Sequence, residues 1–424
     1  MKPKVSIILI AIFALGLILR FLYFPNNIYF GGEQARDAIE ARNILNRQYP
    51  LLGPHSTLRG IHHSPLYYYV LAPLYYIGNG DPRIPAFFIR VIHACGVFVV
   101  FSITSLIFSW NVGLIAALLY AISVEQIQMS IYLSNASIGL MCVLLSWWGM
   151  LHFAVKKRQW GMIVAALFAG LAMLFDLIFI LTGFTMLCVY ILRRSKFPPL
   201  RFKTRMYAAL AYSVSMLLLL YVNGLQSIKI IRLPTTANFF EDRFSKIYMV
   251  IRQWSTDNLI ALPYLSTAFL IIVGIYLWHL TRRKHNLQFM ILAFWLLVGI
   301  IPYFFTTHLW LDYYYHANAT VVLLLVSASL LEKLMKTNSK IFWIILFCIV
   351  FINTRHSIHN NPDGPNNRII APGGLLLTHE LDVIFEFSSG NPESREHYQY
   401  IRTSPEGEML LFYLTTYYHA LWEQ

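Results

Sequence analysis

The stretch "QWGMIVAALFAGLAMLFDLIFILTGFTMLCVYIL" (159–192) decides how this chain is arranged, because Asp176 is its only charged residue. As a single helix rising 1.5 Å per residue, it would be roughly 50 Å long. The apolar core of a bilayer is only about 30 Å thick. The run therefore predicts two short membrane spans, 159–175 and 177–192, joined by a turn at Phe175 and Asp176.

The charges on either side of this run agree with two spans. "VKKRQW" (155–160) comes before it and "RRSKFPPLRFKTR" (193–205) follows it. With two spans, both basic segments lie on the side of the N-terminal "MKPK", as do the later "TRRKH" and "EKLMKTNSK". Lys and Arg gather in cytoplasmic loops, so we expect this side, with the N-terminus, to be cytoplasmic. One fused span would send the later basic loops outward.

The composition also indicates a membrane protein. The chain has 424 residues, of which 57% are hydrophobic and 12% charged, whereas globular domains have roughly a quarter charged. The net charge of +13 does not indicate nucleic acid, because the basic residues cluster between apolar runs, as in loops that face anionic lipid. We predict an all-α polytopic membrane protein with about eleven spans, near 5–24, 86–109, 111–124, 136–154, 159–175, 177–192, 206–222, 259–279, 287–304, 314–332 and 339–354.

The ends and the cysteines add little to this arrangement. The N-terminal apolar run has no clear small-residue cleavage site, so we interpret it as a retained span. The four cysteines lie in or beside apolar runs without metal-ligand spacing and are interpreted as small hydrophobic residues. We expect a transmembrane domain over 1–354 and an extracytoplasmic tail or small cap over 355–424, which begins with a Pro/Asn/Gly-rich linker.

The first outer loop (25–85) holds the most polar sequence near the start of the chain. In "YFGGEQARDAIEARNIL" (29–45), helical spacing places Glu33, Asp37 and Glu40 on one face. We predict a helix over 33–48 with its alanines on the opposite face. "SPLYYYVLAPLYYIG" (64–78) is too short to span and rich in tyrosine, which is typical of a helix lying in the membrane interface.

Three segments of this region together resemble one known family. "GGEQARDAIEARNIL", "PHSTLRGIHHSPLYYYVLAPLYYIG" and "DPRIPAFFIRVIHACGV" look like the first outer loop and second span of the polytopic lipid-linked-sugar glycosyltransferases of the C-type membrane fold. These include the protein O-mannosyltransferases and the lipid A aminoarabinose transferases. The resemblance covers residues 5–155 and is only topological beyond. It implies a hexosyl- or pentosyltransferase that moves a sugar from a polyprenyl-phosphate donor to an acceptor on the outer membrane face, with inversion.

The chain departs from the family pattern at several positions. Glu33 and Gln34 stand where the family has Asp and Glu. His63 and Ser64 replace a Lys-Pro pair, so the residue expected to hold the donor phosphate is titratable here. Arg90 matches the arginine at the entry to the second span. These replacements leave open a non-catalytic relative of the transferases.

The implied reaction needs a carboxylate that takes the proton of the acceptor, and cations or hydrogen-bond donors for the leaving phosphate. Glu33 aligns with the catalytic acid of the family and is our candidate base. Asp37 is the second catalytic candidate, or it orients Arg36 or the acceptor. A solvated acidic helix face with a favourable helix dipole is the alternative for these carboxylates.

Candidates for binding the donor phosphate come from three segments of the chain. They are His62, His63, Arg59, Arg90, His308 and Tyr314, with His316 as a further choice in the late outer loop "THLWLDYYYHANATVVLLL" (307–325). The alternatives are interfacial histidines among tyrosines, an aromatic belt around the late loop, and a snorkelling arginine in Arg90.

Other assignments follow from the same features. The paired histidines and the acidic helix could bind Zn or Mn, but no further spacing supports a cage, so no metal or other cofactor is assigned. The expected partners are the lipid-linked donor, a lipid, glycan or protein acceptor, and membrane lipids. We expect a multi-pass protein of a prokaryotic plasma membrane. The rival function is a transporter or flippase, in which ionisable groups would line a path through the spans.

Overall fold

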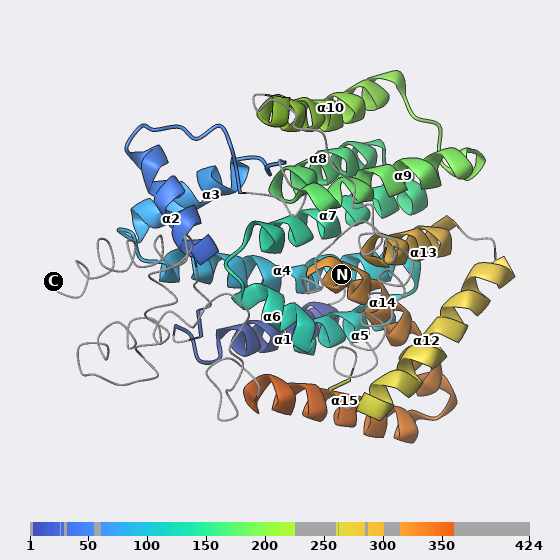
Figure 1. The fold of residues 1–424 in the computed structure, drawn as a ribbon. Coiled ribbons are helices and arrows are strands. Elements are labelled where there is room, and N and C mark those ends of the chain that lie inside the picture. The colour runs from blue at the N-terminus through green and yellow to red at the C-terminus, as the bar shows by residue number, and fades with distance from the viewer. Residues whose placement is uncertain are drawn as a thin grey trace, which may run out of the picture.

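The computed structural model describes residues 3–25, 27–28, 32–54, 61–224, 260–261, 263–284, 287–300 and 314–359. Within these ranges the regular elements are all helical (Figure 1). In chain order they are α1 (Pro3–Phe21), α2 (Gly32–Leu45), α3 (Leu66–Ile77), α4 (Arg83–Ile107), α5 (Trp110–Ile122), α6 (Val124–Ile131), α7 (Asn135–Lys156), α8 (Gln159–Phe175), η1 (Leu177–Phe179), α9 (Ile180–Leu192), η2 (Arg194–Lys196), α10 (Phe202–Gly224), α12 (Pro263–Lys284), α13 (Leu287–Ile300), α14 (Tyr314–Thr337) and α15 (Ser339–His359).

The predicted break in the 159–192 run is confirmed. Helix α8 ends at Phe175, Asp176 is extended, and the short 3₁₀ helix η1 leads into α9. The Asp176 carboxylate accepts a hydrogen bond from the backbone N–H of Ile178 at 3.1 Å. Asp176 therefore caps η1, because a capping carboxylate satisfies an N–H group that has no partner within the helix.

The predicted apolar runs all contain helices. These helices fall into a long group and a short group. Among the described residues, six helices are long and apolar enough to cross a membrane. Helices α5 and α6 make a seventh if that pair, bent by 53°, is one span. Shorter apolar helices cover 159–175, 177–192, 264–280 and 287–299. The protein is thus a polytopic, all-α membrane protein, and the count of eleven spans stays a prediction.

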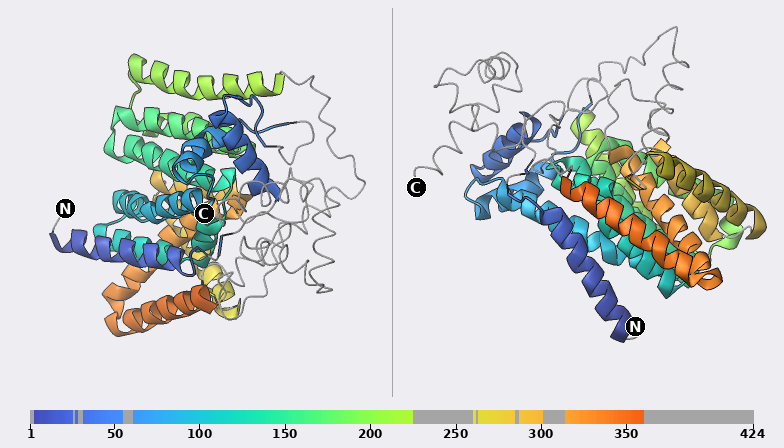
Figure 2. Two further views of the ribbon diagram at one scale, coloured as in Figure 1. Left: turned by 90° about the vertical axis from the view of Figure 1, so that its left-hand side faces the viewer. Right: turned by 90° about the horizontal axis from the view of Figure 1, so that it is seen from below.

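The long helices lie side by side as a bundle whose core is α4, α5, α7 and α14 (Figures 1 and 2). Trp147 of α7 and Trp295 of α13 are fully buried in it and stack at 5.4 Å between ring centroids. The peripheral helices α10 and α15 expose large apolar residues such as Leu217 and Phe347. Exposed apolar side chains along whole helices are typical of lipid-facing surfaces.

The two ends of the bundle differ in charge. The α7–α8 turn carries Lys156, Lys157 and Arg158, and η2 between α9 and α10 carries further basic residues. At the opposite end lie the C-terminus of α1 and the two helices of the first loop, α2 and α3 (Figure 2). We call this second end the site end.

Both helices predicted in the first loop are present. Helix α2 ends at Leu45, three residues before the predicted limit, and α3 matches the predicted interfacial helix. The predicted outer segment 225–258 lies outside the described residues, as do 304–313 of the late loop and 360–424 of the tail. Helix α15 continues to His359, past the predicted domain limit at 354.

Candidate active site

The side chains of α2 differ in their burial. Ala35, Ala38 and Ala41 are buried, as the pattern predicts. Glu33 is exposed, but Asp37 is only 3% exposed. The burial of Asp37 does not fit the alternative of a solvated acidic face, because α3 packs against α2.

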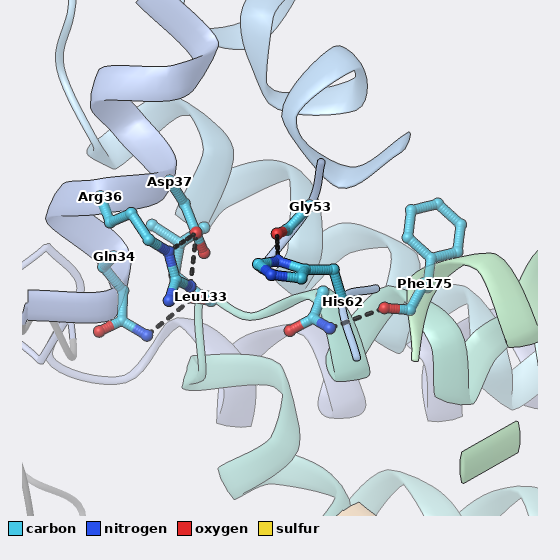
Figure 3. Close-up of polar contacts among 8 residues, drawn as sticks. Gln34, Arg36, Asp37, Gly53, His62, Leu133 and Phe175 are labelled. Atoms are coloured by element: carbon cyan, nitrogen blue, oxygen red, sulfur yellow. Dashed lines mark hydrogen bonds and ion pairs between the residues drawn. The ribbon is translucent and has the colours of Figure 1, made fainter. Parts of the chain in front are cut away.

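Asp37 pairs with its neighbour Arg36. The Nε and Nη2 atoms of Arg36 donate to one Asp37 carboxylate oxygen at 2.9 and 2.7 Å (Figure 3). Burial raises the pKa of Asp37, and the charge of Arg36 acts in the opposite direction. The charge of Glu33 acts on both residues. Three ionisable groups on one turn and a half of helix are thus coupled electrostatically.

Two tyrosines of α3 cover this pair. Tyr67 and Tyr68 are buried, and the charges of Asp37 and Arg36 both act on them. The hydroxyl of Tyr67 is buried without a hydrogen-bond partner within the described residues. Because an unsatisfied buried hydroxyl costs roughly 1–3 kcal/mol, this group is suited to a polar ligand that reaches the α2–α3 contact.

His62 is tied to the end of α10. Its backbone N–H donates to the Asn223 side-chain oxygen at 2.8 Å, and the Asn223 amide donates back to the His62 carbonyl at 3.1 Å. The His62 Nδ1 atom lies 2.9 Å from the Gly53 carbonyl oxygen (Figure 3). A carbonyl only accepts, so His62 carries its proton on Nδ1.

His63 has the opposite tautomer. Its Nδ1 accepts a hydrogen bond from the backbone N–H of Leu177 at 3.1 Å. The proton of the neutral ring is therefore on Nε2, where it can be donated. Asp176 is 3.8 Å from the same Nδ1, too far for a hydrogen bond, and burial raises the pKa of Asp176.

Further polar contacts join neighbouring turns at the site end. Gln34 of α2 donates to the Leu133 carbonyl between α6 and α7 at 3.1 Å, and Asn135 donates to the Phe175 carbonyl at 2.7 Å (Figure 3). The Gln34, His63–Leu177 and His62–Asn223 contacts connect the first loop to the ends of α6, α8 and α10, and the Asn135 contact joins α7 to α8. The candidate residues of the first loop are thus held on a rigid bundle.

Arg90 lies apart from these contacts, inside α4. Its side chain is fully buried and donates to the backbone carbonyls of Arg20 and Asn27 and to the Asn27 side chain. The guanidinium carbon lies 4.7 Å from the centroid of the Phe24 ring. Arg90 connects α4 to the segment between α1 and α2, and a phosphate role for it stays a prediction.

Four of the predicted phosphate-binding candidates lie outside the described residues or have no described side chain. Arg59 and His308 are outside the described residues, and only the backbone of Tyr314 and His316, at the start of α14, is described. Within the described residues, no three His, Cys, Asp or Glu side chains come together as ligands for a metal ion.

Sequence reasoning did not assign roles to three residues that matter here. The predicted topology places Asp176 at an outer turn, where it either approaches the site or lies in water, and Gln34 is a departure from the motif. Asn223, at the last turn of α10, gave no signal at all.

Comparison with known proteins agrees with this architecture. Residues 62–223 match the model of the dolichyl-phosphate-mannose-protein mannosyltransferase family. The match begins after α2, so the acidic helix lies outside it, and it extends through α10, well beyond residue 155. Comparison with curated protein sequences gives no match.

Solved structures show the same fold at low sequence identity. The oligosaccharyltransferase of Archaeoglobus fulgidus superposes with a TM-score of 0.62 at 12% identity, over 94% of this chain and 60% of that one. Its complex with an inhibitory peptide and a dolichol-phosphate gives 0.59 at 12% identity, over 94% of this chain and 59% of that one. ArnT of Cupriavidus metallidurans bound to undecaprenyl phosphate superposes with a TM-score of 0.51 at 12% identity, over 81% of this chain and 62% of that one.

This chain spans about 60% of the length of the transferases that it matches. At such identities the likeness concerns the fold, and the family match covers the part from His62 to Asn223. The resemblance predicted from the first loop is confirmed: the chain has the fold of the polytopic lipid-linked-sugar transferases and resembles the mannosyltransferase family over its central part.

Proposed function

We propose that this protein is a membrane glycosyltransferase that moves a sugar from a polyprenyl-phosphate donor to an acceptor at the outer membrane face. The observation that carries the proposal is the arrangement at the site end. An exposed carboxylate, Glu33, lies beside the ion pair of buried Asp37 with partly buried Arg36, on a helix fixed to the bundle by Gln34. The comparisons support the proposal. The matched family is described by dolichyl-phosphate-mannose, and two of the similar solved structures are complexes with dolichol-phosphate and undecaprenyl phosphate.

Glu33 is the proposed general base. It lies in the first turn of α2 and is exposed, so an acceptor hydroxyl or amine can reach it from water. The base takes the acceptor proton while the acceptor attacks the anomeric carbon from the face opposite the phosphate, which inverts the configuration. A positioned base typically contributes 10²–10⁴-fold to the rate.

His63 is the preferred ligand for the leaving phosphate. Because Nδ1 is used by the Leu177 N–H, the neutral ring offers its Nε2–H as a donor without needing a positive charge. His62 holds its Nδ1 proton against Gly53, so it can donate from Nε2 only as a cation. The phosphate roles of Arg59, Arg90, His308 and Tyr314 stay part of the proposal.

The hydrogen bonds of the buried arginines inside the spans do not favour the rival function of a transporter or flippase. Arg20 and Arg90 donate to backbone carbonyls of neighbouring helices and are 0% exposed. Groups that line a transport path face a water-filled cavity or exchange partners. The proposed plasma-membrane location and the outward orientation of the site end rest on the basic turns at the opposite end.

Sugar transfer from a radiolabelled panel of polyprenyl-phosphate hexoses and pentoses tests the proposal, with the purified full chain in nanodiscs. We expect Glu33→Gln to lose about a hundredfold or more in turnover while it still binds donor. The matched control is Glu40→Gln, two helical turns further along α2, where the side chain is partly exposed. Its turnover should stay within about twofold of the wild type.

Each other outcome points to a different conclusion. A wild-type protein that binds no donor contradicts the transferase and favours the transporter. Donor binding without transfer to any acceptor, water included, supports the non-catalytic relative. If Asp37→Asn loses turnover to that extent and Glu33→Gln stays active, Asp37 is the base instead.

A further inference from the structure

The turn between α8 and α9 places a buried carboxyl group beside the candidate phosphate ligand. Asp176 is 5% exposed and His63 is 7% exposed. The Oδ1 atom of Asp176 lies 3.8 Å from the Nδ1 atom of His63. A movement of about 1 Å would bring these two atoms to hydrogen-bond distance. The proposed chemistry leaves this buried acid without a role.

The Nδ1 atom of His63 faces two groups that require opposite protonation states. The backbone N–H of Leu177 donates to it at 3.1 Å, which requires Nδ1 without a proton. An ionised Asp176 only accepts, so a hydrogen bond between it and Nδ1 requires the proton on Nδ1. The ring therefore bonds to Leu177 when it is neutral and to Asp176 when it is an imidazolium.

Burial favours one shared proton within this pair. It raises the pKa of Asp176, while the charge of His63 acts in the opposite direction. A buried carboxylate is costly unless a cation pairs with it. The proton is thus either on Asp176, beside a neutral His63, or on His63, beside an ionised Asp176. The contact with Leu177 belongs to the first arrangement.

The other ionisable groups of the described elements around this pair are directed elsewhere. Helix α8, η1 and the first turns of α9 contain no ionisable residue. The ring of His62 is bonded to a backbone carbonyl, and α10 contributes an amide to the same residue. Tyr67 and Tyr68 of α3 respond to the charges on α2. His63 is the group whose charge acts on Asp176.

Sugar transfer changes the charge of the leaving group. A sugar-bearing polyprenyl phosphate is a phosphodiester with a single ionised oxygen. When the bond from the anomeric carbon to oxygen breaks, its electron pair stays on the phosphate, and the product is a monoester with a second pKa of about 6. A cation that forms only as this second charge develops stabilises the transition state more than the ground state.

We propose that Asp176 is a positioning residue that charges His63 as the phosphate leaves. This inference rests on the proposed function, in which the Nε2–H of His63 bonds to the phosphate. The carboxyl proton of Asp176 moves to Nδ1 of His63, which leaves an imidazolium facing the phosphate and a carboxylate behind it. The Leu177 N–H loses a neutral hydrogen bond, and charge-assisted bonds about twice as strong form in its place. The proton stays within the pair, and the proton of the acceptor goes to Glu33.

The first test compares two ligands that differ in charge. They are undecaprenyl phosphate and undecaprenyl methyl phosphate, a diester that cannot take the second charge. Thermophoresis of the full chain in detergent measures both affinities at a pH of about 7.5, where a free monoester is mostly a dianion and a free imidazole mostly neutral. We expect the wild type to prefer the monoester by about tenfold. Asp176→Asn should lose this preference and keep its affinity for the diester.

The pH dependence separates this role from a structural one. Asp176→Asn retains a side-chain oxygen that can accept from the Ile178 N–H. As the pH falls to about 6, solvent protonates His63 in this variant, so its preference for the monoester should return. A merely structural residue would leave the pH dependence unchanged. The matched control is Asp81→Asn, because Asp81 pairs with Arg83 instead, and it should behave as the wild type.

The second test observes the proton directly. Nitrogen NMR of the wild-type chain with isotope-labelled histidine distinguishes a protonated from an unprotonated Nδ1, and the signal lost in His63→Gln assigns His63. We expect Nδ1 of His63 to be unprotonated in the free chain and with the diester bound. It should become protonated when undecaprenyl phosphate binds.

The outcomes separate this inference from the proposed function. An equal preference for the monoester in wild type and Asp176→Asn overturns the role of Asp176 and leaves the transferase standing. An Nδ1 of His63 that stays unprotonated with undecaprenyl phosphate bound does the same. A wild type that binds neither phosphate overturns both proposals. If Asp176→Asn does not fold, the NMR result on the wild type decides.

Discussion

Arginines with defined partners occur in two regions of this molecule: Arg20 and Arg90 are fully buried, whereas Arg36 is 23% exposed. In the α1–α4 region, Arg20 and Arg90 donate to backbone carbonyls and form no ion pair within the described residues. In the α2–α3 region, Arg36 pairs with Asp37, and the exposed Glu33 acts on both. The first region satisfies backbone groups where helices break or end, and the second collects charges of both signs at the site end.

The difference teaches that a buried charge alone does not identify a reacting group. Both terminal nitrogens of Arg90 donate hydrogen bonds to Arg20 and Asn27, which fixes the segment that leads from α1 to α2. Arg36 is directed to a carboxylate that can change its protonation state. The carbonyl partners of Arg90 keep one protonation state, whereas the carboxylate partner of Arg36 can gain or lose a proton.

Replacing Arg90 is expected to give the largest loss of stability. Arg90→Met leaves the carbonyls of Arg20 and Asn27 and the Asn27 side chain without their donor, and each unsatisfied buried group costs roughly 1–3 kcal/mol. Removal of a buried charge offsets part of this cost, so we expect a net loss of about 3 kcal/mol. The thermal unfolding midpoint in detergent measures it.

The matched control for that variant is Arg83→Met, on the same helix. Arg83 has a half-exposed side chain and pairs with Asp81, and such pairs contribute roughly 0–1 kcal/mol. Similar losses in the two variants, or a loss of donor binding by Arg90→Met without any loss of stability, would contradict the structural role of Arg90.

Asp37→Asn is expected to have an effect that depends on pH rather than one constant loss. Burial raises the pKa of Asp37 above the ordinary value of about 3.9. The folded chain then holds this proton more tightly than the unfolded chain, so stability falls as pH rises from about 4 through the raised pKa. A tenfold difference in proton affinity corresponds to about 1.4 kcal/mol.

The asparagine variant should lack this fall. The measurement is the difference in unfolding midpoint between wild type and Asp37→Asn across pH 4 to about 8. Parallel curves would show that Arg36 outweighs burial and keeps Asp37 ionised throughout, which would make the pair structural, like the contacts of Arg90.

The smallest expected effect belongs to His63. In His63→Phe the Leu177 N–H loses its acceptor, at a cost of about 1 kcal/mol, while His63→Gln can supply an oxygen in its place. We expect the midpoint to fall in the phenylalanine variant and recover in the glutamine variant. Equal midpoints would show that the His63–Leu177 contact does not stabilise the turn.

Much of the fold could be predicted from the sequence because the bilayer imposes simple rules. A run such as 159–192 must break, since its length exceeds the hydrocarbon core and Asp176 interrupts it. The burial of the α2 alanines was predicted correctly by helical periodicity, and α3 forms where the tyrosine-rich helix was predicted.

The site could be predicted only in part. The positions of Glu33 and Asp37 along a helix follow from their spacing, but the burial of Asp37 depends on α3, which begins more than twenty residues later in the chain. The contact of His63 with Leu177 joins residues 114 positions apart. Periodicity within one element carries no information about such partners.

The sequence by itself thus determined the class of this protein, its helices, and the loop that bears its acidic residues. These follow from local properties, namely apolar length, helical period and the distribution of basic residues. Tertiary structure alone decided which charged groups are buried and which tautomers the two histidines adopt. Each of those depends on side chains that distant segments bring together, because desolvation and hydrogen bonding are set by neighbours in space.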